Sequence, residues 1–362
     1  MIAVLVLVAV AAGAASPQPA PPSSSSSDDV VDQGGRGRGF PATWPWVSFY
    51  GAADKVSLPR VARTFRVIDV DADPGLGGFS RAQIAVLSAG GRNRVLSYLN
   101  VGSCESFRTY YRTAPPGFVP CAENRNAQRG VYRGYPDEVW MDPSDPQYQQ
   151  LLVGYVAARL AATGVDGFFI DNLEIVEHDA RADNGPCDSR CRQGGLELVA
   201  RLRAAFPRRL LVLQNATGEV TRAGRVAGAP FAALIDGVSR ESVFAPAVDP
   251  AGLRQLQAWR DLGLTPGGQS FFVGSEDYVG SCQQTAAAQR VMTASRRERF
   301  APYVSDSSAG QQRVCFWNLT PRGAAALGGR IIAKTPVTGP EPENRQGAKG
   351  RKERQEDEWS GP

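Results

Sequence analysis

Short apolar runs alternate with segments of helical spacing along most of this chain. Strands are predicted at the apolar runs, which are residues 46–50, 64–70, 94–99, 167–170, 210–214, 234–239, 270–274 and 303–305. Helices are predicted between them, at residues 80–89, 145–162, 196–206, 253–262 and 283–300. Strands that alternate with helices indicate βα units around a parallel sheet. About eight such units favour an α/β fold, a single (β/α)8 TIM barrel, over a doubly wound open sheet, whose Gly-rich phosphate or dinucleotide loop is missing.

The barrel is expected over residues 41–334, and the composition changes at both of its ends. Residues 1–16 combine an apolar run with small residues, which is typical of a signal peptide, although the usual basic start is missing. Residues 17–40 are rich in Pro, Ser and Gly and are expected to be a disordered linker, and residues 335–362 a charged, disordered tail. No later apolar run is long enough to cross a membrane, so the sequence predicts a secreted protein without membrane contact in its mature form.

Charge and cysteine content narrow the class of protein. The net charge is only +4, with 40 basic and 36 acidic side chains, which does not point to a nucleic acid. An even number of cysteines, 6, in a secreted chain indicates disulfides, although six cysteines allow 15 pairings. Neighbours in sequence favour Cys104 with Cys121, Cys187 with Cys191, and Cys282 with Cys315. A zinc site at Cys187 and Cys191 is the alternative, but the usual CxxC pairs and histidines are missing.

The segment 164–174, GVDGFFIDNLE, is the first candidate for chemistry. Its apolar strand ends abruptly at Asp171, and Asn172 and Glu174 follow. Catalytic groups of α/β barrels lie at the C-terminal ends of strands, whereas an Asp that caps the next helix is the plainer alternative. Polar side chains occur at the ends of most of the other predicted strands in the same way, at Asp69, Asp71, Glu105, Asn215, Glu241, Asp277 and Tyr278. This placement predicts one functional cleft at the C-terminal face.

Carboxylates combined with aromatic side chains are typical of glycoside hydrolysis. One carboxyl group must stay protonated to donate to the leaving oxygen, and another must stay ionised as nucleophile or base. Four aromatic side chains could stack on sugar rings or could equally belong to the core: Trp46, Tyr98, Trp140 and Tyr278. The chain has one histidine, His178, and no GxSxG motif, which argues against a histidine-rich metal hydrolase and a serine hydrolase.

Seven motifs occur in order along residues 44–315: Asp69-Val70-Asp71, SYLNVGSCE at 97–105, Trp140-Met141-Asp142, GVDGFFIDNLE at 164–174, Gln214-Asn215-Ala216, GVSRES at 237–242 and Glu276-Asp277-Tyr278. With them, the chain resembles glycoside hydrolase family 114, the endo-α-1,4-polygalactosaminidases. The resemblance implies a (β/α)8 enzyme that cleaves α-1,4-linked galactosamine polymers in endo fashion. We expect it to act as a secreted monomer, without a metal or cofactor. Two departures are Glu174, where many relatives carry Asp, and the segment 107–139, which is rich in Tyr, Pro and Gly and is expected to lie over the top of the barrel.

The resemblance also implies roles for individual residues. Asp171 would be the nucleophile or base, and Glu241 the general acid/base. The residues expected to bind substrate are Asp69, Asp71, Tyr98, Glu105, Trp140, Asn172, Glu174, Asn215, Asp277 and Tyr278. A catalytically inactive barrel that binds carbohydrate or the cell wall is the first alternative. A metal-dependent lyase or esterase, with Asp69, Asp171 and Glu241 as oxygen ligands, is the second.

Overall fold

The computed structural model describes residues 39–40, 45–307 and 311–317. The expected signal peptide, nearly all of the expected linker and the expected charged tail lie outside the described residues. Within the described part, eight strands form one parallel sheet, in the order β1 (Trp46–Phe49), β2 (Val67–Val70), β3 (Arg94–Asn100), β7 (Gly167–Asp171), β8 (Leu210–Gln214), β11 (Gly237–Glu241), β12 (Phe272–Val279) and β13 (Ala301–Asp306). The predicted α/β fold, a (β/α)8 TIM barrel, is confirmed.

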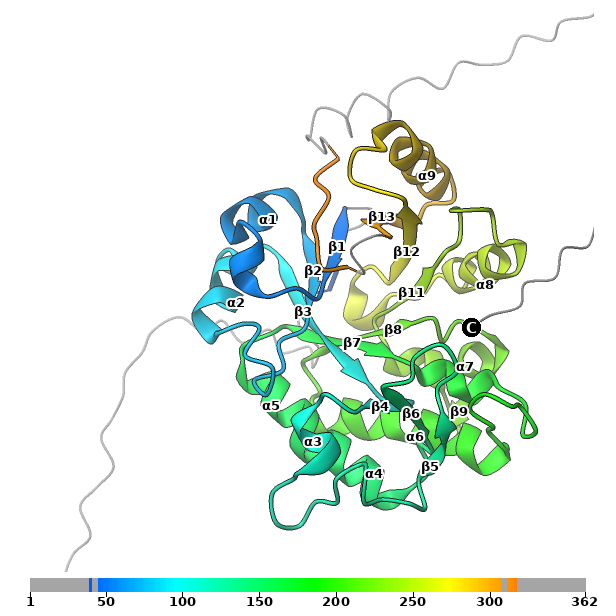
Figure 1. Ribbon diagram of the computed structural model, residues 1–362. Coiled ribbons are helices and arrows are strands. Elements are labelled where there is room, and N and C mark those ends of the chain that lie inside the picture. The colour runs from blue at the N-terminus through cyan, green and yellow to red at the C-terminus, as the bar shows by residue number, and fades with distance from the viewer. Residues whose placement is uncertain (1–38, 41–44, 308–310, 318–362) are drawn as a thin grey trace, which may run out of the picture. The chain divides into compact units, whose positions relative to one another are not determined.

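The sheet closes because its two edge strands, β1 and β13, lie against each other (Figure 1). The indole N–H of Trp46 on β1 donates a hydrogen bond of 3.0 Å to the carbonyl oxygen of Ala301 on β13. The Trp46 ring lies inside the barrel, with the rings of Phe169, Phe272 and Tyr303 at centroid distances of 5.6, 5.6 and 5.5 Å. Trp46 is therefore a core residue that joins the barrel seam.

Helices surround this sheet in Figure 1. They are α1 (Leu58–Thr64), α2 (Arg81–Ser88), α4 (Pro146–Gln150), α5 (Ala157–Ala162), α6 (Ser189–Ala205), α7 (Glu219–Ala223), α8 (Pro250–Asp261) and α9 (Thr285–Arg297). The predicted Ser80 cap of α2 is present as a full capping box, in which Gln83 bonds back to the Ser80 backbone. Side chains of Asp145, Asp188 and Asp249 cap α4, α6 and α8.

Several elements differ from their predicted bounds. The predicted helix 145–162 is interrupted by a π-helical turn at Leu151–Val156. Helix α6 begins at Ser189 rather than near residue 196, since the polar residues before 196 face solvent and hide the helical pattern. Strand β12 continues to Val279, so Glu276, Asp277 and Tyr278 lie within the strand. Polar side chains inside the barrel interrupt the apolar run there, which made the strand look shorter.

The segment between β3 and β7 forms a small antiparallel sheet of β4 (Ser103–Glu105), β6 (Glu138–Met141) and β5 (Gln128–Val131), in the order β4–β6–β5. A short helix, α3 (Thr109–Arg112), lies between β4 and β5. The Cys104–Cys121 disulfide joins β4 to the loop after α3. This inserted sheet begins directly after the C-terminal end of β3.

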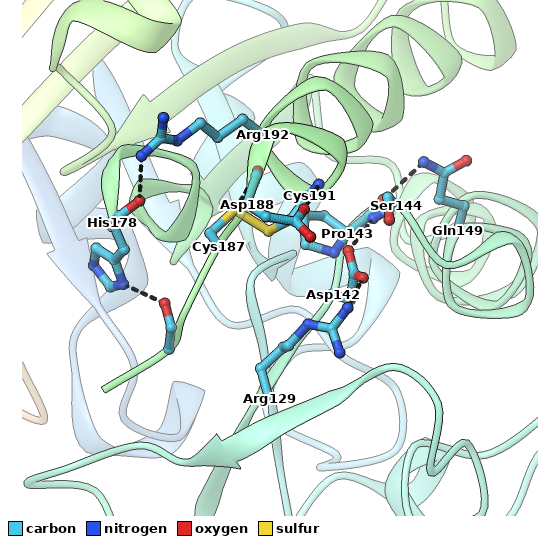
Figure 2. The surroundings of a disulfide bond; sticks show 11 residues. Arg129, Asp142, Pro143, Ser144, Gln149, His178, Cys187, Asp188, Cys191 and Arg192 are labelled. Carbon is cyan, nitrogen blue, oxygen red and sulfur yellow. Dashed lines mark hydrogen bonds and ion pairs between the residues drawn. A yellow bond between two sulfur atoms is a disulfide. The ribbon is translucent and has the colours of Figure 1, made fainter. Parts of the chain in front are cut away.

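All six cysteines lie in described residues and form the three predicted disulfides. Figure 2 shows the Cys187–Cys191 pair at the start of α6, where Asp188 accepts a hydrogen bond of 2.9 Å from the Cys191 backbone N–H. Arg192 donates to the carbonyl oxygen of His178 at 2.8 Å, so the disulfide and this bond together hold the loop after β7 against the helix. The His178 ring bonds to a loop carbonyl, that of Gly185, at 2.9 Å.

None of the described helices is long and apolar enough to span a bilayer.

We expect Trp46→Phe to lower the free energy of unfolding by about 1–3 kcal/mol, because the buried carbonyl of Ala301 loses its donor. Urea unfolding followed by circular dichroism measures the change. Val86→Ala, at a side chain that is 44% exposed on α2, is the control and should stay within about 0.5 kcal/mol of the wild type. Equal stability of the Trp46 variant and the wild type would show that the indole bond does not stabilise the seam.

Candidate active site

A cleft of about 510 Å³ lies at the C-terminal ends of the barrel strands. Seven of the residues expected from the sequence to form the site line it: Asp71, Tyr98, Glu105, Asp171, Asn172, Asn215 and Glu241. The cleft also contains residues that the sequence analysis did not select: Tyr50, Leu76, Phe107, Arg108, Tyr132, Tyr135, Glu138, Gln311 and Gln312. Polar groups from separate strands therefore meet in one place, as the fold requires.

Asp171 is the last residue of β7 and reaches the cleft from a strand that is buried on both faces. Burial raises the pKa of its carboxyl group well above the ordinary value, and the neighbouring carboxyl groups of Glu174 and Glu241 raise it further. A hydrogen bond from the Tyr98 hydroxyl acts in the opposite direction. Such an acid favours its protonated form in the free protein.

Asn172 turns the chain sharply behind Asp171, with a φ of 60° in the left-handed region. Its side chain donates to the Ser103 hydroxyl at 2.7 Å and so connects β7 to β4. Gly102 packs against this turn, where an added Cβ atom would lie 1.7 Å from the Asn172 carbonyl oxygen. A side chain at position 102 would displace the turn that carries Asp171, so this close approach requires glycine.

Glu241, the last residue of β11, is held by side chains from the strands on both sides. The Asn215 amide, just after β8, donates to one carboxylate oxygen of Glu241 at 2.7 Å. The Tyr278 hydroxyl, on β12, donates to the other. The Glu241 backbone N–H in turn donates to the Asn215 side-chain oxygen at 3.0 Å. These bonds fix the orientation of the Glu241 carboxylate in the cleft.

Glu174 does not line the cleft, but its carboxyl group raises the pKa of Asp171. It lies in a 3-10 turn, Leu173–Glu177, directly after Asn172. Burial is the first cause that raises its pKa to about 8, and the charge of Glu241 adds to it. One of its oxygens is buried and has no hydrogen-bond partner among the described residues. Glu174, Asp171 and Glu241 thus form a group of interacting carboxyl groups.

Arg108 is the main cation beside the cleft, and it is almost fully buried. Its guanidinium contacts Asp71 at 2.8 Å, Glu105 at 3.1 Å and Asp73 at 3.6 Å. It also lies over the Tyr98 ring, 5.3 Å from the centroid. Arg108 therefore neutralises acids on one wall of the cleft. No local pattern in the sequence distinguishes it from the other arginines.

The barrel interior below the cleft is also polar. Asp69 is fully buried there and accepts hydrogen bonds from Ser48 at 3.2 Å and Tyr50 at 2.7 Å. Glu276 is fully buried as well and accepts a bond of 2.6 Å from Gln311. Burial raises the pKa of both acids well above the ordinary values. The structure thus places Asp69 under the cleft, where it holds the cleft-lining Tyr50.

Three other expected residues lie outside the cleft lining. Trp140 is buried and stacks on Tyr132 at a centroid distance of 4.0 Å, so it supports the cleft wall from behind. Asp277 accepts hydrogen bonds from the backbone N–H groups of Phe244 and Ala245 and thereby shapes the loop after β11. Tyr278 meets the site through its hydroxyl, which bonds to a carboxylate.

One group of metal-ligating side chains occurs among the described residues: Cys282, Asp306 and Cys315. The two sulfur atoms are joined in a disulfide, and none of the three residues lines the cleft.

A model of glycoside-hydrolase family GH114 matches residues 31–238, more than half of the chain. This chain belongs to glycoside-hydrolase family GH114. The match includes Asp171 and ends just before Glu241. The members of this family are glycoside hydrolases, whose substrates are polysaccharides or other glycosides.

Solved structures show the same fold. The glycoside hydrolase domain of PelA from Pseudomonas aeruginosa is 18% identical, with a TM-score of 0.54 over 75% of this chain and 96% of that chain. A variant of the same domain gives a TM-score of 0.55 at 18% identity, again over 75% of this chain and 96% of that chain. Among curated proteins, no sequence matches this chain.

We expect Glu174→Gln to reduce the loss of stability that the wild type shows between about pH 5 and pH 8. The pKa of Glu174 rises from an ordinary 4.5 to about 8 on folding, so the folded state holds the proton more tightly. Its stabilisation is complete below pH 4.5 and is lost as the pH rises through about 8. Urea midpoints across this range give the slope.

Glu197→Gln, at an exposed position on α6, is the matched control and should follow the wild-type slope. A Glu174→Gln curve parallel to that of the wild type would contradict the assignment of a raised pKa to Glu174.

Proposed function

We propose that this protein is a secreted glycoside hydrolase that cleaves α-1,4-linked galactosamine polymers in endo fashion, with Asp171 and Glu241 as its catalytic carboxyl groups. The observation that carries the proposal is that both carboxyl groups reach one cleft, at the C-terminal ends of β7 and β11, in a chain of family GH114. The three disulfides agree with an oxidising compartment outside the cell.

Glycoside hydrolysis needs one protonated and one ionised carboxyl group. Burial and neighbouring carboxyl groups raise the pKa of Asp171, so the free protein favours a proton on Asp171. The sequence analysis gave Asp171 the role of nucleophile or base, which needs the ionised form. We propose that Asp171 gives up its proton before it acts as nucleophile or base, and that Asn215 and Tyr278 hold Glu241 in place for its part in the reaction.

The exposed aromatic side chains on the cleft wall are evidence in favour of a sugar substrate. Phe107 and Tyr135 line the cleft, although they are 56% and 58% exposed. Tyr135 packs on Tyr132 at a centroid distance of 4.9 Å, and Tyr132 stacks on the buried Trp140. Large exposed aromatic surface in a cleft is typical of a binding site, and Tyr135 is supported from behind by Tyr132 and Trp140.

The first experiment incubates the full chain with partly deacetylated α-1,4-galactosaminan and follows the release of oligomers by mass spectrometry. We expect Asp171→Asn and Glu241→Gln each to fold and to lose at least about 100-fold in rate, since each removes a proton-transferring or nucleophilic group. Asp183→Asn, at an exposed acid, should keep wild-type activity.

Near-wild-type turnover in either cleft variant would overturn the catalytic pair. Retention of the wild-type protein on the polymer without release of oligomers would instead favour the inactive carbohydrate-binding barrel.

We expect Phe107→Ala and Tyr135→Ala to raise KM by about 2- to 10-fold with little change in kcat, because an aromatic contact contributes about 0.5–1.5 kcal/mol. Initial rates against polymer concentration measure both constants. Val131→Ala is the control, because Val131 is 61% exposed on β5 but does not line the cleft. Unchanged KM values in both aromatic variants would remove these side chains from substrate binding.

A further inference from the structure

Two glutamates face each other on the inserted sheet that forms one wall of the cleft. Glu105 on β4 and Glu138 on β6 are direct partners across the two antiparallel strands. Side chains of such partners point to the same face of the sheet, and both residues line the cleft. Like charges in this position are normally destabilising. The presence of two glutamates in this position therefore requires a physical explanation.

The structure neutralises this pair only in part. Arg108 binds one oxygen of Glu105 at 3.1 Å. Glu105 is only 2% exposed, and its other carboxylate oxygen is buried without a hydrogen-bond partner among the described residues. An unpartnered carboxylate oxygen of this kind, in the wall of a cleft, is a costly arrangement without a ligand.

Glu138 is held by neutral groups. The Ser103 hydroxyl donates to it at 2.9 Å, and the Asn172 amide donates at 3.4 Å. Among the described residues it forms no ion pair. Burial raises its pKa to about 7, and the charge of Glu105 is the second cause. Hydroxyl and amide donors orient the carboxylate without cancelling its charge.

The acidic side chains of this wall outnumber the cationic side chains that bind them. Arg108 serves Asp71, Asp73 and Glu105, and Arg159 binds Asp73 from outside at 2.7 Å. A cationic ligand would therefore complete the wall. An ammonium group carries three donors and one charge, which suits the unpartnered oxygen of Glu105 and the carboxylate of Glu138. A divalent metal ion would need six or more oxygen ligands at short range.

We propose that Glu105 and Glu138 form a subsite that binds the ammonium group of an amino-sugar ring, and that Glu138 determines the preference for deacetylated over N-acetylated polymer. This inference rests on the proposed function, since it assigns the recognition of substrate charge to the same cleft. Catalysis and charge recognition are thus divided between two parts of the chain. Asp171 and Glu241 lie on barrel strands, and the ammonium subsite lies on the inserted sheet.

The test measures KM and kcat of Glu138→Gln on partly deacetylated α-1,4-galactosaminan and on its fully N-acetylated form. Glutamine keeps an oxygen that can accept from Ser103, so the variant should fold. We expect KM for the deacetylated polymer to rise about tenfold, as for the loss of one charge-assisted hydrogen bond, with unchanged constants on the N-acetylated polymer. Glu123→Gln, at an exposed position of the same inserted segment and outside the cleft, should behave as the wild type.

Three outcomes would overturn the proposal. An equal rise of KM on both polymers would show a structural role for Glu138. Unchanged constants on both would show that Glu138 does not contact the substrate. Stimulation of the wild type by Ca²⁺ or Mg²⁺ that disappears in Glu138→Gln would assign the subsite to a metal ion.

A second measurement separates this inference from the proposed function. If the wild type releases no oligomers from either polymer, the hydrolase proposal fails, and electrophoresis through gels that contain each polymer tests the subsite alone. Slower migration in deacetylated polymer that is lost in Glu138→Gln would support the ammonium subsite. Equal migration of the two proteins in both gels would reject it.

Discussion

The burial of several carboxyl groups beside one another, with few cations to neutralise them, is the condition on which the cleft depends. A parallel barrel brings the C-terminal ends of all its strands to one face, so acids that end different strands must meet there. Asp171 and Glu241 approach in this way from β7 and β11, and Glu174 adds a third carboxyl group behind them. Repulsion and burial then keep protons on groups that would be ionised in water.

The fold compensates for these acids mainly with neutral donors. Tyrosine hydroxyls and side-chain amides bond to Asp69, Glu241 and Glu276. Such donors orient a carboxylate but leave its charge available to a ligand, whereas a salt bridge cancels it. The guanidinium of Arg108 is the exception beside the cleft, and it acts mainly on Asp71 and Glu105. The cleft therefore combines fixed geometry with an excess of acid, which suits both proton transfer and a cationic substrate.

The position of a site residue could be predicted from the sequence where a single strand determines that position. The run Gly167–Ile170 is apolar without interruption and then meets Asp171, so burial and a strand end could both be predicted from neighbouring residues. Tyr50 was missed because the predicted strand, residues 46–50, included it, whereas β1 ends at Phe49. The strand-end pattern could not tell which polar side chains enter the cleft and which point into the barrel below it, as Asp69 and Glu276 do. That choice depends on the register of neighbouring strands.

The strand pairing of the inserted sheet could not be predicted from the sequence, for a different reason. Glu138 and Arg108 reach the cleft because β4 pairs with β6 and because β4 begins just after the C-terminal end of β3. These pairings join residues more than thirty positions apart, and no local pattern of apolar and polar residues records them.

The disulfide between Cys104 and Cys121 lies next to residues of the cleft wall. Cys104 lies on β4 between Ser103, which holds Glu138, and Glu105 itself. The covalent bond thus anchors the cleft wall without touching the barrel strands that carry Asp171 and Glu241. The inserted sheet thus has a covalent link of its own, in addition to its contacts with the turn after β7. Because Gly102 and Ser103 also contact Asn172, the covalent bond helps to hold the turn behind Asp171 as well as the proposed ammonium subsite.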